Sequence, residues 1–195
     1  MPVVKTKPAT YADIEALPPN MIGEILYGTL VTQPRPARRH AVAASVLGMM
    51  LGPPFSFGNG GPGGWIIIYE PELHLGPHVV VPDIAGWRRE RFTEIEEGPW
   101  FETVPDWICE IQSPSTRAFD LGPKRRIYAA WQVEYLWYVD PGPMSLEVFK
   151  RQDESWLLTH TFLNQETVCA PPFDAINFSL GQLWPFDPTP ADDSN

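Results

Sequence analysis

Residues 107–112 read Trp-Ile-Cys-Glu-Ile-Gln, an apolar run of the length of a β-strand, and the sequence Ser-Pro-Ser-Thr that follows ends it. Side chains alternate between the two faces of a strand, so Glu110 shares a face with Ile108 and Gln112, while Cys109 faces the other way. An acidic side chain among apolar neighbours needs a cation or a positively charged partner. The sequence therefore predicts a central strand with a functional carboxylate near its end.

A second acidic residue has similar surroundings. Residues 79–87 read Val-Val-Val-Pro-Asp-Ile-Ala-Gly-Trp, which predicts one further strand that contains Asp83. Downstream, Pro123 suits the first position of a helix, so Lys124 is expected in its first turn. An Asp and a Glu on neighbouring strands can share a divalent cation, and a nearby lysine would complete a phosphodiesterase site. The alternative is that both carboxylates are structural, as ion-pair or capping groups.

Composition limits the class of protein. The 195 residues are 44% apolar, which fits one domain over residues 1–185, followed by a flexible C-terminal tail at residues 186–195. A net charge of -10 argues against a protein that coats nucleic acid, although an enzyme can contact a few phosphates through a local basic patch. Two cysteines predict no disulfide framework, and no apolar run reaches membrane-spanning length. We expect a soluble, cytoplasmic protein without membrane contact.

The remaining segments alternate between short strands and helices. Thr10 is expected to cap a short helix that Pro18 and Pro19 end. The other expected elements are strands 22–26 and 29–32, a helix 40–51, a Gly- and Pro-rich loop 52–64, a strand 65–69 that residues 70–75 continue or pair with, a surface loop 88–99, a strand 135–139 and a hairpin of 146–150 with 155–159.

The order of the polar residues resembles the Uma-two family, a branch of the PD-(D/E)XK nuclease superfamily. The resemblance covers the chain from about Tyr11 to about Phe149. It rests on Glu24, His40, Pro82-Asp83, Glu110-x-x-Ser113-Pro114-Ser115-Thr116, Lys124, Tyr128 and Tyr135-x-x-Tyr138-Val139-Asp140-Pro141.

The resemblance implies an α/β fold of the restriction-endonuclease-like type, with a strongly bent, mixed β-sheet flanked by helices. It also implies that Asp83, Glu110 and the backbone carbonyl of Ile111 bind Mg²⁺ or Mn²⁺. A metal held in this way would lower the pKa of a bound water and neutralise charge on the scissile phosphate. A homodimer is implied as well, because nucleases of this kind cut two strands with paired sites.

The sequence departs from the superfamily pattern at one position. The usual lysine stands two residues after the Glu, where this chain has Gln112, which carries no positive charge. Lys124 on the following helix is the candidate to replace it, by stabilising negative charge in the transition state. Arg125 is an alternative donor of similar reach, and Lys124 as an ordinary solvated lysine is the structural alternative.

Three further residues are candidates with two interpretations each. Glu24 either binds a second metal or a metal-bound water, or pairs with Lys124 or an arginine. His40 follows the basic residues Arg35, Arg38 and Arg39; it either contacts a phosphate or moves a proton, or it caps the helix. Gln112 and Arg39 are the other candidate substrate contacts. Asp106 is expected only to begin the central strand.

We therefore expect a Mg²⁺-dependent endonuclease that hydrolyses phosphodiester bonds of DNA, with Asp83, Glu110, Lys124 and Glu24 as catalytic residues. Two alternatives remain open. The chain is a non-catalytic binding or assembly module that keeps the nuclease fold, which its acidity and the missing Glu-x-Lys favour. Alternatively, it is a metal-dependent nuclease that acts on RNA.

Overall fold

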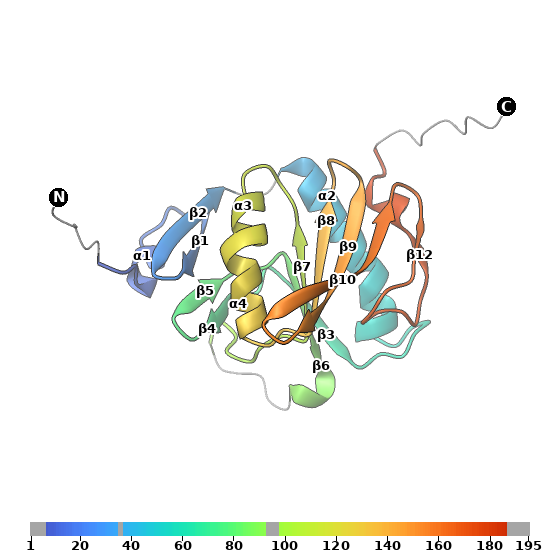
Figure 1. Ribbon diagram of the computed structural model, residues 1–195, viewed down its shortest axis with the longest axis horizontal. Coiled ribbons are helices and arrows are strands. Elements are labelled where there is room, and N and C mark those ends of the chain that lie inside the picture. Colours follow the sequence, from blue (N-terminus) through green and yellow to red (C-terminus); the bar gives the residue numbers. More distant parts are fainter. Residues whose placement is uncertain (1–6, 35–36, 93–97, 187–195) are drawn as a thin grey trace.

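A computed structural model describes residues 7–34, 37–92 and 98–186 of the protein (Figure 1). Arg35, residues 93–97 of the expected surface loop and residues 187–195 of the expected tail lie outside the described residues. Phe186, the first residue of that tail, is exposed.

The larger sheet has six strands and is mixed. Strands β7 and β8 are parallel, and the other neighbours are antiparallel. In spatial order the strands are β10 (Ser155–Leu163), β9 (Ser145–Gln152), β8 (Tyr135–Asp140), β7 (Trp107–Ile111), β6 (Ile84–Arg88) and β3 (Trp65–Tyr69). The expected central strand is thus confirmed as β7, in the interior of the sheet and buried along its whole length.

The smaller sheet lies at one side of the molecule, next to the helix that follows β7 (Figure 1). All its strands are antiparallel. In spatial order they are β2 (Thr29–Pro34), β1 (Met21–Leu26), β5 (His78–Val80) and β4 (Leu73–Leu75). A short pair, β11 (Thr167–Val168) with β12 (Phe178–Ser179), lies near the C-terminus.

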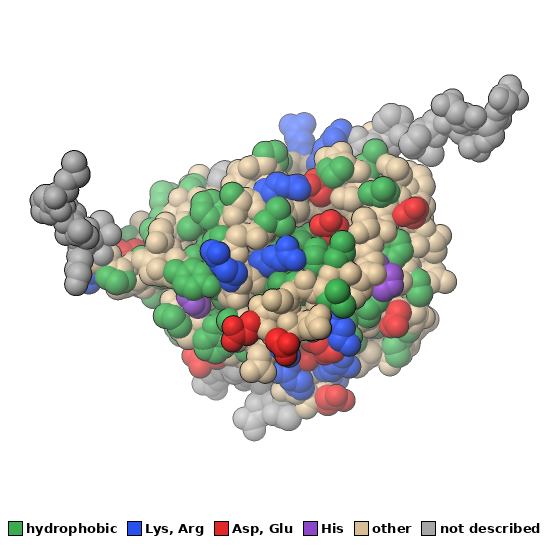
Figure 2. Space-filling model, in the orientation of Figure 1, with side chains coloured by type: hydrophobic (Ala, Val, Ile, Leu, Met, Phe, Trp, Pro, Cys, Tyr) green, Lys and Arg blue, Asp and Glu red, His purple; other side chains and the backbone are tan. Residues whose placement is uncertain are grey.

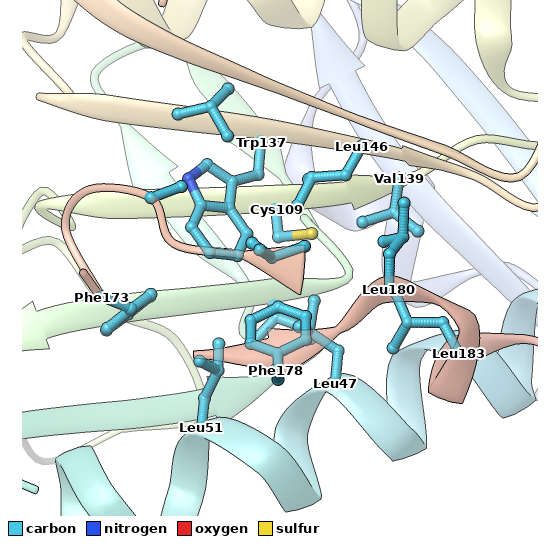
Figure 3. Close-up of a cluster of buried hydrophobic side chains, with 14 of the residues drawn as sticks. Leu47, Leu51, Cys109, Trp137, Val139, Leu146, Phe173, Phe178, Leu180 and Leu183 are labelled. Carbon is cyan, nitrogen blue, oxygen red and sulfur yellow. The ribbon is translucent and has the colours of Figure 1, made fainter. Parts of the chain in front are cut away.

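Helices cover both faces of the larger sheet. On one face α2 (Arg38–Leu51) packs Ala43, Leu47 and Leu51, which are spaced at one side of the helix, against Trp107, Cys109 and Ile111. The C-terminal segment, with Phe173, Phe178 and Leu183 among others, completes this core (Figure 3). Full burial of one such side chain stabilises the fold by roughly 1.5–3 kcal/mol. Cys109 is therefore an apolar filler, as expected.

The opposite face of the sheet packs against a second helical segment. Ile108 and Leu136 of the sheet contact Ile127 and Tyr128 of α4 (Arg125–Ala130), together with apolar residues of the smaller sheet such as Leu26. Successive residues of β7 thus enter different cores, which confirms the predicted alternation. Glu110 points toward the helix and the smaller sheet, and its neighbours point toward α2.

The expected single strand 79–87 is wrong. The chain forms β5, leaves the smaller sheet at Val81-Pro82-Asp83, and enters the larger sheet as β6. Pro82 has no backbone N–H for a sheet ladder, which explains a break inside an otherwise apolar run. The expectation that residues 70–75 continue or pair with strand 65–69 is also wrong, because β4 pairs with β5 and not with β3. Asp83 consequently lies just before the first residue of β6, and this end of β6 is paired with the end of β7.

The helix after β7 starts earlier than expected. It runs through α3 (Arg117–Phe119), a wide π-helical stretch at Asp120–Lys124 and α4, so Pro123 lies inside it. A proline removes one helical hydrogen bond, and a π-helical turn accommodates that loss. Lys124 is therefore an internal helical residue and not part of a first turn.

The other elements differ from expectation mainly at their ends. Thr10 and Asp13 form the expected capping contacts at the start of α1 (Tyr11–Glu15), with the Thr10 N–H 2.7 Å from Asp13 Oδ2. Helix α2 begins at Arg38, two residues before His40. The expected loop after it starts with a further π-helical turn, Gly52–Ser56. Short 3₁₀ turns occupy Arg89–Arg91 and Leu180–Leu183.

Candidate active site

Glu110 lies at the end of β7 with only 2% of its surface exposed. Its oxygen Oε1 accepts a hydrogen bond from the Tyr128 hydroxyl at 2.6 Å and lies 2.9 Å from Lys124 Nζ. Both contacts use the same oxygen of the carboxylate. The expectation that Glu110 needs a positively charged partner is met by Lys124, which the sequence places 14 residues later.

Lys124 stands in the π-helical stretch with 1% of its surface exposed, so it is not a solvated lysine. Besides Glu110, its ammonium group lies 3.0 Å from Glu24 Oε1 and 3.5 Å from Asp120 Oδ1. It also donates to the carbonyl oxygen of Val81, at 3.2 Å. One buried ammonium group thus connects three carboxylates from three different elements.

Glu24 reaches this cluster from β1 of the smaller sheet. Its Oε1 accepts the Val81 N–H at 2.8 Å as well as the contact from Lys124. Of the two interpretations of Glu24, pairing with Lys124 is the contact that the structure contains. Arg125, the alternative to Lys124, points elsewhere, with its guanidinium carbon 4.5 Å from the centroid of the Phe149 ring.

Asp83 is held at the junction of β6 and β7 by two contacts. Its Oδ2 accepts the backbone N–H of Ile111 at 2.6 Å, and its Oδ1 lies 3.0 Å from His40 Nε2. The first contact links the segment between β5 and β6 to the end of β7. The Asp83 side chain retains 17% exposure, so it faces the solvent side of the cluster.

His40 takes part in the site through Asp83 and does not cap helix α2. The N-cap of α2 is Ala37, and His40 is the third residue of the helix. The imidazole is 7% exposed, and its Nδ1 is a buried nitrogen without a hydrogen-bond partner among the described residues. A buried nitrogen without a hydrogen-bond partner is energetically unfavourable.

Neither of the other two candidate substrate contacts lines the cavity at this cluster. Gln112 is buried, its Nε2 lies 3.5 Å from Asp120 Oδ2, and it does not line the cavity described below. Arg39 is exposed and lines a separate small cavity with Trp184 and Phe186. Asp106 directly precedes β7, which starts at Trp107, and its Oδ2 accepts the Arg88 N–H.

Asp120 is the member of the cluster that sequence reasoning missed. It is 3% exposed, contacts both Lys124 and Gln112, and its carbonyl oxygen accepts the Tyr138 hydroxyl at 2.8 Å. A signal existed in the sequence, because Asp120 and Lys124 have the i, i+4 spacing of neighbours on one helix face. It was overlooked because the helix was expected to begin only at Pro123.

The charges of the cluster are strongly coupled. Burial raises the pKa of Glu110 well above its usual value, Lys124 opposes this rise, and the carboxylates of Asp120, Asp83 and Glu24 add to it. Burial also raises the pKa of Asp120, against the opposing effect of Lys124. Burial alone would lower the pKa of Lys124, but Glu110 and Glu24 outweigh it and hold that pKa well above its usual value. Lys124 therefore remains charged at neutral pH.

A cavity of about 200 Å³ opens onto this cluster. Its walls include Asp83, Glu110, Asp120, Lys124 and His40. The loop between β7 and α3 forms its rim with the hydroxyl-bearing residues Ser113, Ser115 and Thr116, which also bond to one another. The cluster is thus reachable from solvent although its members are almost entirely buried.

Comparison with known proteins identifies a family and a similar fold. The model of the Uma2 family, described as "Putative restriction endonuclease", matches residues 8–181. A crystal structure described as "a putative nuclease belonging to DUF820", from Anabaena variabilis, superimposes with a TM-score of 0.67 and 22% sequence identity, over 91% of this chain and 98% of that chain. No curated protein sequence matches significantly. No helix in the described part of the chain has the length and apolarity to cross a membrane. The family match extends over most of the chain, which therefore belongs to the Uma2 family of nuclease-like proteins.

Proposed function

We propose that this protein is a Mg²⁺-dependent endonuclease that hydrolyses phosphodiester bonds of DNA. The observation that carries the proposal is the convergence of Asp83, Glu110 and Lys124 on one solvent-reachable cavity, with Lys124 Nζ 2.9 Å from Glu110. A buried acid and a second, partly exposed acid can hold a metal ion, and a charged lysine can stabilise charge that develops on a phosphate. Membership of the Uma2 family supports the same reaction class.

The donor atoms fit a hard cation. Asp83 and Glu110 offer carboxylate oxygens, and the backbone carbonyl of Ile111 is the third proposed ligand. Among the described residues, no group of three or more His, Cys, Asp and Glu side chains is placed to hold a metal ion together. Mg²⁺ does not need one, because it keeps several waters and binds proteins through one or two carboxylates. Lys124 and Tyr128 both contact Oε1 of Glu110, and a carboxylate has a second oxygen to offer.

We assign a proposed role to each residue of the cluster. A bound divalent cation would supply Lewis-acid activation of the phosphate and of an attacking water. Lys124 retains its proton and presents a fixed positive charge where negative charge develops on the phosphate. His40 positions Asp83 through the contact of 3.0 Å. Glu24 and Asp120 hold the ammonium group in place at 3.0 and 3.5 Å.

The surface of the protein favours a local contact with the substrate. The net charge is -10, and on the face shown in Figure 2 the basic side chains stand in several separate places among acidic ones. Affinity for DNA through a continuous basic track is therefore not expected. The proposed active form is a homodimer, because two sites are needed to cut two strands.

Cleavage assays test the proposal directly. Supercoiled plasmid, linear duplex, single-stranded DNA and RNA of matched sequence are incubated with Mg²⁺, Mn²⁺ or EDTA. We expect wild-type protein to cut DNA only with a divalent metal, and Asp83→Asn and Lys124→Met to lose this cleavage. Asp153→Asn, in the hairpin turn between β9 and β10, is the matched control and keeps it. Cutting of RNA in preference to DNA would favour the alternative substrate.

A non-catalytic module remains the rival function. It is favoured by the contacts of Lys124, whose ammonium group is already paired with three carboxylates. If correctly folded wild-type protein cuts none of the four substrates with any metal, the rival function replaces the enzyme.

A further inference from the structure

A second cavity of about 480 Å³ adjoins the first one. The two cavities share the residues Ile22, His40, Glu70 and Asp83 in their walls. Glu70 is fixed beside Asp83, because its N–H donates to the Asp83 carbonyl oxygen at 3.0 Å. Because Asp83 lines both cavities, a nucleotide chain with a phosphate at Asp83 would lie at the entrance of the second cavity.

Tyr69 forms an aromatic wall of the second cavity. It is the last residue of β3 and is 45% exposed, although it is a large aromatic side chain. The tip of its ring is docked on helix α2 at Gly48, where an added Cβ atom would lie 0.9 Å from the Tyr69 hydroxyl. Only a glycine at position 48 admits this arrangement. The ring is thus held in place by the helix while part of its surface stays open.

The chemistry of the cavity favours a base and not a phosphate. Among the described residues no lysine or arginine lines it, and the acids Glu70 and Asp83 stand at its border with the first cavity. The helix contributes the small side chains of Ala41 and Ala44, which leave room beside the ring. Asn20 and Ser45 add groups that can hydrogen-bond to the edge of a base.

The buried nitrogen of His40 is an independent indication of a ligand. His40 lines both cavities, is 7% exposed, and its Nδ1 has no hydrogen-bond partner among the described residues. A buried imidazole nitrogen without a partner is unfavourable unless a ligand or a water satisfies it. Because His40 lines both cavities, a nucleotide that spans them would contact this side chain.

We propose that the second cavity binds one unpaired nucleobase next to the scissile phosphate, stacked on Tyr69. The inference rests on the proposed nuclease function and narrows its substrate class. In an intact duplex each base is stacked between its neighbours, so only a base that is single-stranded, mismatched or extruded enters such a cavity. Base stacking on an aromatic side chain tolerates different sequences. The substrate is therefore DNA with an unpaired nucleotide at the cleavage point, and not a fully paired recognition sequence.

Binding in EDTA tests this proposal without any requirement for cleavage. The probe is a short single-stranded DNA with one 2-aminopurine, whose fluorescence is quenched on stacking. We expect wild-type protein to quench it, Tyr69→Phe to behave like wild type, and Tyr69→Leu to bind about 5- to 150-fold more weakly, the range that corresponds to a stacking contribution of ~1–3 kcal/mol. Tyr27→Leu is the matched control, since Tyr27 is 56% exposed and lies at the β1–β2 turn. Equal binding by Tyr69→Leu and wild type would overturn the proposal.

A second test uses one variant that fills the cavity from helix α2 and a control variant on the same helix that does not. Ala41→Trp places a large side chain in the cavity. Met49→Trp places the same side chain elsewhere on α2, because Met49 is 65% exposed and does not line the cavity. We expect Ala41→Trp to lose quenching and any preference for cutting beside an unpaired base, and Met49→Trp to keep both. Quenching without cleavage in wild type would contradict the nuclease function but support the base site. Cleavage of paired and unpaired substrates at equal rates by wild type and Ala41→Trp would contradict the base site alone.

Discussion

Lys124 Nζ lies 2.9 Å from Glu110 Oε1, and both side chains are 2% exposed. The two residues come from a π-helical stretch and from the end of the central strand, so the contact joins the helix to the sheet. Each buried charge has further polar contacts that offset its burial: Lys124 contacts Glu24, Asp120 and the Val81 carbonyl oxygen, and Glu110 accepts the Tyr128 hydroxyl.

Replacement of Lys124 is expected to affect both stability and catalysis. Lys124→Met leaves three buried carboxylates without their cation, and breaking a buried pair costs about 3–5 kcal/mol. Urea unfolding at pH 8 measures this loss, which should be smaller at pH 5, where the carboxyl groups protonate more readily. Arg126→Met, a change at an exposed neighbouring residue, is the control. A Lys124→Met variant as stable as wild type at pH 8 would show that the ion pair is unimportant.

A charge exchange between positions 112 and 124 tests whether the lysine has moved along the chain. Gln112 Nε2 and Lys124 Nζ both lie 3.5 Å from oxygens of Asp120, so an ammonium group at either position reaches the same carboxylate. We expect Lys124→Gln to abolish cleavage and the double variant Gln112→Lys, Lys124→Gln to recover part of it. A double variant that folds but does not cleave would show that a lysine at position 112 cannot replace Lys124.

The raised pKa of Glu110 gives stability a definite pH dependence. Burial is the main cause of the rise, with Asp120, Asp83 and Glu24 adding to it against Lys124. A carboxyl group with a higher pKa in the folded chain stabilises the fold below its unfolded pKa, about 4.3, and loses that contribution as pH rises through the folded pKa. Without divalent ions, the unfolding free energy should fall as the pH rises above the unfolded pKa, by up to about 1.4 kcal/mol per pH unit from this group, until the folded pKa is passed. Glu110→Gln should flatten the profile; parallel profiles would refute the assignment.

His40 is expected to act on metal binding through Asp83. Loss of a hydrogen-bonded partner of a ligand typically weakens metal affinity about 10- to 100-fold. His40→Ala removes the 3.0 Å contact to Asp83 Oδ1 and should weaken Mn²⁺ binding by that factor in a titration. His160→Ala, on the exposed face of β10, should bind like wild type. Unchanged Mn²⁺ affinity in His40→Ala would show that this histidine has no role in metal binding.

Much of the larger sheet was predictable because its strands have simple patterns. Residues 107–112 and 135–139 are apolar runs between turn signals, and the alternation in the first run placed Glu110 and Cys109 on opposite faces. The contact of Glu110 with Lys124 could be anticipated only as a need for a positive partner. Its geometry depends on the packing of the helix against the sheet, which a local pattern does not contain.

The errors have two physical sources. Both concern prolines: the pattern around the first predicts one continuous strand, and the second is predicted to start a helix. Pro82 divides an apolar run between two sheets, and Pro123 lies within a helix at a π-helical stretch instead of starting one. A helix that starts at Pro123 excludes Asp120, so the expected boundary gives no indication of the contact between Asp120 and Lys124. The contact of His40 with Asp83 joins residues 43 positions apart in the sequence and required the fold.

Calorimetric titration with Mn²⁺ and Mg²⁺ tests the central claim most directly. The account predicts saturable binding by wild-type protein, loss of binding in Asp83→Asn and Glu110→Gln, and unchanged binding in Asp153→Asn, whose side chain lies in a hairpin turn away from the cavity. Folding of each variant is verified by circular dichroism. Absence of metal binding in folded wild-type protein, or equal binding by Asp83→Asn and wild type, would contradict it.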